Sequence, residues 1–139
     1  PYQPRDALRA SLTAPDAHWF SLQPACNALV FPSKFYGILA AGRPCIFIGD
    51  PRSRLADFIR DYHIGYVVSP GDVASCLEAI RQLRDSPEKR AAMGRRAREV
   101  FERDLQFETT ADRWRRLLKI EQRVQNNRPH PSPSTNSER

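Results

Sequence analysis

The sequence predicts an α/β protein in which helices flank a parallel sheet. Short runs of apolar or aromatic residues, typical of strands, alternate along the chain with longer segments of helical periodicity. One of these runs, residues 45–48, is wholly apolar, as strands are when helices cover both faces of a parallel sheet. Because strand–helix–strand connections in one sheet are right-handed crossovers, this element order indicates parallel strands.

Three strands are expected, over residues 17–22, 45–48 and 65–68. The first is rich in aromatic side chains, and a Ser-Pro-Gly turn closes the last. Sheets usually have about five or six strands, so three strands make a thin sheet. We therefore expect a Rossmann-like parallel sheet that is the second half of its domain, with the opening strands before Pro1.

Helix starts are marked by residue types that cap helices. Ser53 and Asp72 stand at N-cap positions, and Ser86-Pro87 places serine at the N-cap and proline at the first helical position. The expected helices cover residues 6–13, 33–41 and 53–61, the segment that Asp72 caps, residues 86 to about 103, and about 108–123.

The helix capped by Asp72 carries apolar residues with a period of 3.6. We expect this stripe to cover one face of the sheet, so that Leu77→Ala costs about 2–5 kcal/mol, as large-to-small core changes do. The stripe consists of Val73, Cys76, Leu77, Ile80 and Leu83.

Composition places the chain among soluble proteins of a reducing compartment. Hydrophobic residues make up 40% of the 139 residues, and no apolar run approaches the ~20 residues that span a bilayer. No signal-peptide pattern is visible. The three cysteines form no CxxC pair and have no histidine at ligand spacing, so we expect neither a metal site nor a disulfide framework. A cytoplasmic location is expected.

The net charge of +6 comes from the C-terminal helices, because residues 81–128 carry fourteen basic and eight acidic side chains. The end of the chain is different: residues 126–139 contain three prolines and no apolar side chain. Such a composition cannot form a core. We therefore expect one domain over residues 1–125 and a disordered tail over residues 126–139.

An anion-binding site is expected where a helix opens on Pro32-Ser33-Lys34. Free N–H groups and the positive dipole end of a helix N-terminus attract phosphate at the carboxyl ends of parallel strands. A lysine in a first turn is slightly unfavourable for the helix, which favours a functional role for Lys34. Gly37 costs the helix about 0.5–1 kcal/mol against alanine and indicates close approach by backbone or ligand.

Several motifs resemble family-4 glycosyltransferases. FPSKFYGILAAGRPCIFIGD (residues 31–50) resembles the donor-site helix and following strand of these enzymes. The likeness covers residues 1–118 without a gap, and it is greatest to transferases of bacterial capsule, O-antigen and colanic-acid-type exopolysaccharide assembly. The other matching stretches are residues 1–22, residues 63–101 and FETTADRWRRLL at residues 107–118.

The resemblance implies a GT-B fold, in which two Rossmann-like domains face each other across a cleft. The chain would be most of the C-terminal domain, which holds a nucleotide-diphosphate sugar as substrate, with no cofactor or metal. Transfer would be to a glycan or lipid-linked acceptor. The catalytic base and the basic pair on the diphosphate would lie outside this chain, so no catalytic residue is assigned. Donor-binding positions carried over are Asn27, Leu29, Ser33, Lys34 and Gly37.

The sequence departs from the family pattern at two positions, and several of the donor-binding residues also have other interpretations. Many family members have two glutamates eight positions apart here, where this chain has Leu29 and Gly37. Asn27 could be a turn former, Ser33 an N-cap and Lys34 a solvated side chain. The alternative function is a non-catalytic α/β binding module that uses its basic C-terminal helices on a polyanion. Those helices could also rest on anionic lipid at the inner face of the membrane. Nucleic acid is not expected as a partner, because no recognition motif is present.

Overall fold

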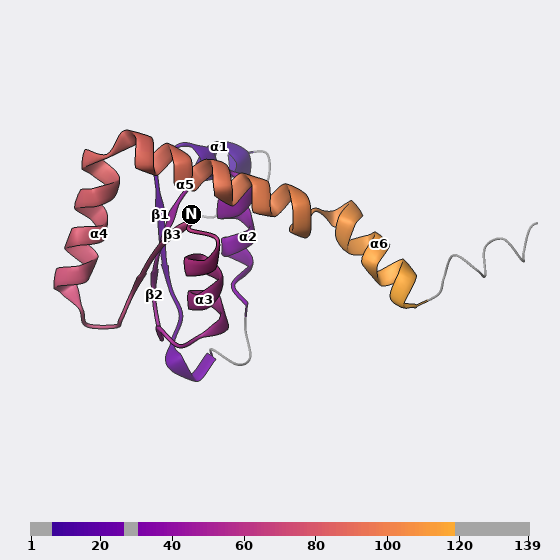
Figure 1. Ribbon diagram of the computed structural model, residues 1–139, viewed down its shortest axis with the longest axis horizontal. Helices are drawn as coiled ribbons and strands as arrows, with labels where there is room; N and C mark the ends of the chain where they lie inside the picture. Colours follow the sequence, from indigo (N-terminus) through magenta and orange to yellow (C-terminus); the bar gives the residue numbers. More distant parts are fainter. Residues whose placement is uncertain (1–6, 27–30, 119–139) are drawn as a thin grey trace, which may run out of the picture. The chain divides into compact units, whose positions relative to one another are not determined.

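The computed structural model describes residues 7–26 and 31–118 and shows an α/β protein with a parallel three-stranded sheet (Figure 1). The strands are β1 (His18–Ser21), β2 (Cys45–Ile48) and β3 (Gly65–Val68), in the order β1-β2-β3. Each strand lies in register with the next without a bulge, from His18↔Cys45↔Gly65 to Ser21↔Ile48↔Val68. The predicted parallel sheet and its three strands are confirmed, with β1 one residue shorter at each end.

The predicted helix starts are also confirmed where a capping side chain marks them. The Ser53 hydroxyl accepts a hydrogen bond from the Ala56 N–H at 3.2 Å, and the Asp72 carboxylate accepts one from the Ser75 N–H at 3.0 Å. Pro87 is the first residue of its helix. The helices are α1 (Leu8–Thr13), α2 (Ser33–Ala40), α3 (Arg54–Asp61), α4 (Val73–Asp85), α5 (Pro87–Val100) and α6 (Phe107–Leu117).

The helix predicted from Ser86 to about Arg103 changes its geometry near its end. α5 stops at Val100, and Phe101–Leu105 continues as a π-helical turn. Phe101 and Leu105, four positions apart in this turn, both pack against the core. The chain divides at Gln106: residues up to 106 form one compact unit, and α6 belongs to a second. The expected tail, residues 126–139, lies outside the described residues.

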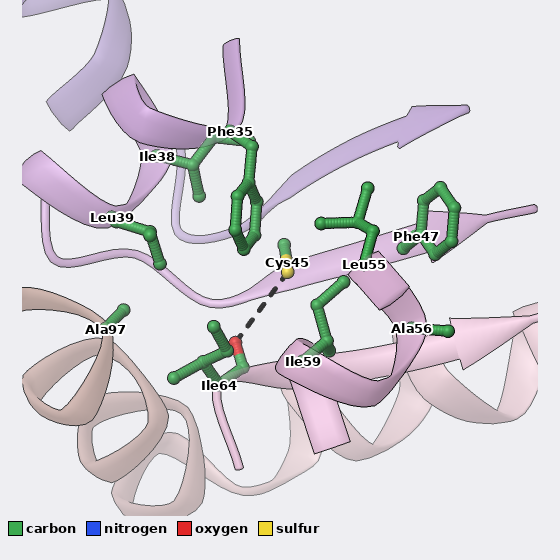
Figure 2. Packing of buried hydrophobic residues seen from close by; sticks show 10 residues of the cluster. All are labelled: Phe35, Ile38, Leu39, Cys45, Phe47, Leu55, Ala56, Ile59, Ile64 and Ala97. Atoms are coloured by element: carbon green, nitrogen blue, oxygen red, sulfur yellow. Dashed lines mark hydrogen bonds between the residues drawn. The ribbon is translucent and has the colours of Figure 1, made fainter. Parts of the chain in front are cut away.

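The larger core fills the sheet face that α2 and α3 cover (Figure 2). Phe47 of β2 lies beneath the two helices, and the Phe20 ring stands 5.3 Å from the Phe47 ring. Burial raises the pKa of the Cys45 thiol to about 12, so this cysteine stays protonated and packs as a small apolar residue. The cluster consists of Phe35, Ile38, Leu39, Cys45, Phe47, Leu55, Ala56, Ile59, Ile64 and Ala97.

The opposite face carries a smaller core beneath α4, and here one prediction is wrong. α4 does cover the sheet, but with Ala79 and Leu83 and with the half-buried Cys76. Three members of the predicted stripe are exposed instead: Val73 by 67%, Leu77 by 46% and Ile80 by 43%. The residues that meet the sheet, Cys76, Ala79 and Leu83, lie at one edge of the predicted stripe. The helix is therefore rotated about its axis relative to the prediction, and the side of Leu77 faces away from the sheet.

Candidate anion-binding site at the carboxyl edge of the sheet

Three helix N-termini lie at the carboxyl edge of the sheet. α2, α3 and α4 follow β1, β2 and β3 respectively, and α2 and α3 then run back to deliver the chain to the amino end of the next strand (Figure 1). Each helix start leaves backbone N–H groups without an intrahelical acceptor. Which ligand this edge can bind therefore depends on which of these N–H groups already have a hydrogen-bond acceptor within the protein.

The starts of α3 and α4 are satisfied by their own capping residues. Ser53 and Asp72 each accept a hydrogen bond from an N–H of the first turn. Hydrogen bonding with Ser75, through its side chain first and its backbone second, lowers the pKa of the Asp72 carboxyl. A carboxylate of the protein thus already occupies the anionic position at the start of α4.

The start of α2 has no such cap. Its N-cap residue is Pro32, in an extended conformation, and no side chain caps the helix. The interpretation of Ser33 as an N-cap is therefore wrong, because Ser33 is the first helical residue. Within the described part of the chain, neither the Ser33 N–H nor the Lys34 N–H has an acceptor. Both residues are exposed, and no acidic side chain stands in this first turn.

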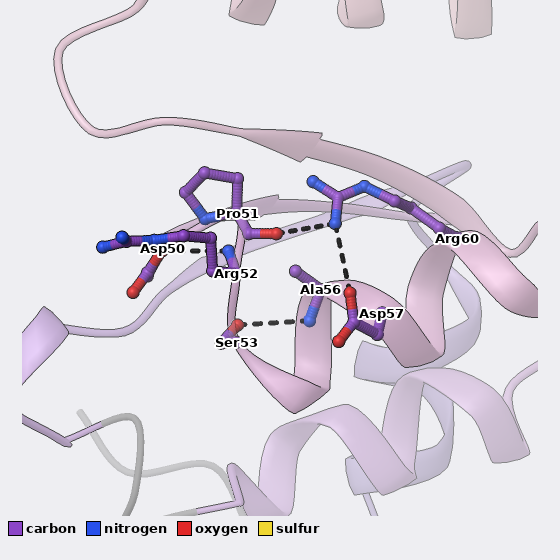
Figure 3. A network of polar contacts seen from close by, with 7 residues as sticks. All are labelled: Asp50, Pro51, Arg52, Ser53, Ala56, Asp57 and Arg60. Carbon is purple, nitrogen blue, oxygen red and sulfur yellow. Dashed lines mark hydrogen bonds and ion pairs between the residues drawn. The ribbon is translucent and has the colours of Figure 1, made fainter.

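Polar contacts within the chain hold the turn that follows β2 (Figure 3). The Asp50 carboxylate accepts a hydrogen bond from the Arg52 backbone N–H at 2.9 Å. It also forms an ion pair with the Arg52 guanidinium at 3.4 Å. Arg60 reaches back to donate to the Pro51 carbonyl oxygen at 2.6 Å and to the Asp57 carboxylate at 3.4 Å. Asp50 thus holds the turn.

Aromatic rings border the start of α2, a feature that the sequence analysis missed. The Phe31 ring centroid lies 5.6 Å from that of Phe35, 5.4 Å from that of Tyr36 and 6.3 Å from that of Phe58. Phe35 is buried, whereas Phe31 and Tyr36 are exposed. Phe31 and Phe35 are four positions apart at the helix start, and this spacing could have predicted their contact from the sequence. Flat apolar rings beside free N–H groups suit a ligand that is partly ring and partly anion.

Of the remaining predicted donor-binding residues, Gly37 is described by the structure, whereas Asn27 and Leu29 are not. A Cβ atom at Gly37 would lie 3.1 Å from the Leu12 Cδ1 atom, so the close approach inferred from this glycine is made by α1. The predicted donor contact of Gly37 stays a prediction. Asn27 and Leu29 lie outside the described residues.

Neither a metal cluster nor a membrane span is found in the parts of the chain that the structure covers. Residues 7–26 and 31–118 contain no group of three His, Cys, Asp or Glu side chains able to hold a metal ion. None of the helices in these ranges is both long and apolar enough to cross a bilayer.

No protein-family model matches this chain, and searches of curated proteins and of solved structures find no significant match to it.

Proposed function

We propose that this chain is the donor-binding part of a glycosyltransferase with a GT-B fold, whose Rossmann-like C-terminal domain it forms in large part. The enzyme would transfer a sugar from a nucleotide-diphosphate sugar to a glycan or lipid-linked acceptor in bacterial surface polysaccharide synthesis. It would work in the cytoplasm or at the inner face of the membrane. The observation that carries the proposal is that α2, alone among the three helices starting at the described carboxyl edge, has no side-chain cap.

The chemistry of the donor fits this helix start. As the glycosidic bond breaks, negative charge develops on the diphosphate leaving group. The N–H groups of Ser33 and Lys34 are fixed by the helix, so they would stabilise this charge without reorganising. The Lys34 ammonium would add a mobile point charge. The exposed rings of Phe31 and Tyr36 would lie beside the less polar part of the same ligand.

The alternative, a binding module for polyanions, has less support from the described residues. Much of the positive charge around α5 and α6 already has a partner within the chain. Arg98 pairs with Glu102 at 2.7 Å, Arg103 with Asp104 at 2.7 Å, and Arg115 with Asp112 at 2.5 Å. Exposed pairs of this kind are worth little for stability, but they reduce the net field that a polyanion would meet.

Calorimetric titration of the chain with a nucleoside diphosphate and with the matching nucleoside tests the proposal. Lys34→Ala should weaken diphosphate binding by about 1.5–3 kcal/mol and leave nucleoside binding unchanged, because only the diphosphate carries charge for Lys34 to contact. The loss should shrink as salt screens the pair. The matched control is Lys89→Ala, which removes the same charge from α5, where the Lys89 ammonium contacts the Gln82 side-chain oxygen at 2.6 Å.

Equal losses for diphosphate and nucleoside would mean that Lys34 only supports the fold. Failure of the unaltered chain to bind any nucleoside diphosphate, together with binding to heparin or anionic vesicles, would favour the polyanion module. We also expect no sugar transfer by the 139-residue chain alone, because the acceptor side of the cleft and the catalytic base would lie outside it. Formation of a glycosylated product would contradict the assignment of the chain as a donor half.

A further inference from the structure

α6 has one continuous apolar face. Its apolar residues follow one another at intervals of three or four, so at 3.6 residues per turn they lie within an arc of about 120°. Leu118 follows the last helical residue and still donates its N–H to the Trp114 carbonyl oxygen at 2.9 Å, which keeps it on this face. The apolar face consists of Phe107, Ala111, Trp114, Leu117 and Leu118.

The large side chains of this apolar face are exposed. Their exposed fractions run from 59% for Trp114 to 80% for Phe107, and no residue of α6 is buried. A single exposed apolar side chain is ordinary on a protein surface. Several large ones on one side of a helix form a patch of the kind that marks an interaction site. The apolar face therefore indicates a contact with another apolar surface.

Arginines stand at both borders of the apolar face. At about 100° per residue, Arg113 lies about 40° beyond Leu117 on one border, and Arg115 lies about 40° beyond Ala111 on the other. Arginine side chains can cover apolar surface with their stems and keep their charge among polar headgroups. The Asp112 carboxylate pairs with Arg115 at 2.5 Å, but an exposed pair of this kind is weak enough to exchange for a lipid phosphate.

α5 is also basic, but it differs from α6 in its apolar side. Met93, Ala97 and Val100 of α5 are all buried. α5 can therefore meet a membrane through charge alone, whereas α6 can also insert apolar side chains. The charge of the sequence is favourable for the same contact, because residues 113–123 carry five basic side chains and one acidic side chain.

A second copy of α6 is a poor occupant of the apolar face. In an antiparallel pair of helices each border faces the same border of the partner, so Arg113 would meet Arg113. In a parallel pair Arg113 would meet Arg115. Both arrangements bring like charges together, whereas the phosphates of anionic lipids attract both borders.

We propose that α6 lies in the plane of an anionic phospholipid bilayer and inserts its apolar face into the interface. Helices with aromatic and leucine side chains on one face and basic side chains on the other bind membranes in this way. Trp114 would lie at the boundary between headgroups and acyl chains, and Arg113 and Arg115 would reach lipid phosphates. The inference rests on α6 alone: it adds an attachment to the membrane to the proposed donor-binding chain and does not depend on donor binding.

Fluorescence of Trp114 tests this insertion. The chain has two tryptophans, so Trp19→Phe leaves Trp114 as the only one. With vesicles of phosphatidylcholine and phosphatidylglycerol in equal parts, the Trp114 emission should shift to shorter wavelength, and bromine atoms on the acyl chains should quench it. Vesicles of phosphatidylcholine alone should bind roughly tenfold more weakly or less, because they lack the negative surface charge.

Two pairs of variants at exposed positions separate insertion from attraction by charge. Leu117→Ser should weaken vesicle binding, measured by sedimentation of the vesicles, roughly fivefold or more. Leu77→Ser, at an exposed leucine of α4, should leave vesicle binding unchanged. Arg113→Gln should weaken it more than Arg95→Gln, which removes the same charge from α5. Nucleoside diphosphate binding without vesicles should be the same in all four variants, so this proposal and the proposed function fail separately.

An unshifted Trp114 emission in the presence of anionic vesicles overturns the proposal, because a contact through charge alone leaves the ring in water. Equal weakening by Leu117→Ser and Leu77→Ser overturns it as well. So does a short-wavelength emission without vesicles. Its dependence on the concentration of the chain would then identify a second copy as the occupant of the apolar face, and its independence would identify another part of the same chain.

Discussion

The two faces of the sheet carry similar apolar residues but differ in how completely helices cover them. On the face of α2 and α3, Phe47 is wholly buried and the Phe20 ring stacks between it and Phe35, with ring centroids 5.3 and 5.7 Å away. On the face of α4, Ile46 is buried while its register partner Trp19 is largely exposed. Side chains at neighbouring strand positions thus differ in burial.

The difference shows that burial here follows the opposing surface and not the residue type. The α2 and α3 face receives two crossover helices, one above each pair of strands. On the other face, the described residues place α4 over β2 and β3, where it packs on Ile46 and Val68 together with Met93 of α5. Trp19 of β1 and the partly exposed Ile80 of α4 line one groove on this face. The following substitutions test how sharply the two faces differ.

Phe47→Ala should have the largest effect, because it removes a wholly buried ring from the covered face. Large aromatic-to-alanine changes in a core cost about 3–5 kcal/mol. The measurement is urea unfolding followed by circular dichroism. Trp19→Ala provides the matched aromatic deletion on the other face and should cost far less in the 139-residue chain. Similar costs for the two would contradict the contrast between the faces.

Leu83→Ala and Leu77→Ala compare two leucines of α4. Leu83 is buried against Ile46 and Met93, so its truncation should cost about 2–5 kcal/mol. Leu77 is half exposed, and its truncation should change the free energy of unfolding by about 0.5 kcal/mol or less. Thermal and urea unfolding of both variants check the pair. A Leu77 variant as unstable as the Leu83 variant would support the original prediction that the Leu77 side of α4 covers the sheet.

Gly94→Ala should disturb both faces together. α5 contributes Met93 to the smaller core and Ala97 to the larger one, and Gly94 lies between them. A Cβ atom at Gly94 would overlap the Gly42 carbonyl oxygen in the turn before β2. Forcing extra volume into a packed site costs about 1–3 kcal/mol. Calorimetric melting should show this loss, whereas Ala91→Gly, at an exposed position of α5, changes only helix propensity. An unchanged melting temperature for Gly94→Ala would mean that α5 can shift freely.

Asp72→Ala should have a smaller effect than the substitutions of buried core residues, and one that depends on pH. The pKa of the Asp72 carboxyl in the folded chain lies below its ordinary value of 3.8. Its stabilising contribution is therefore present above about pH 3.8 and is lost as pH falls through the folded pKa. The stability difference from the unaltered chain should be visible at pH 7 and vanish in acid. Asp72→Asn keeps a capping oxygen and should lose less. A difference independent of pH would contradict the carboxylate cap.

The boundaries of the elements could largely be predicted from the sequence because their causes are local. The apolar run at residues 45–48, the cap of Ser53 and the proline at position 87 each act within one turn or one strand. The structure places β2, the start of α3 and the start of α5 accordingly. For the candidate site, the helix opening on Ser33 and Lys34 was likewise readable, since Pro32 marks it.

The sequence by itself determined the order of strands and helices, the parallel sheet and the place where the helix of Ser33 and Lys34 starts. Only the tertiary structure decided which side of α4 meets the sheet, which neighbour Gly37 accommodates and that the Trp19 side chain is largely exposed. Periodicity gives the angular spacing of side chains around one helix. Whether Leu77 or Leu83 is buried depends on a surface contributed by residues distant in the sequence, such as Ile46 and Met93. Those contacts exist only once the chain has folded.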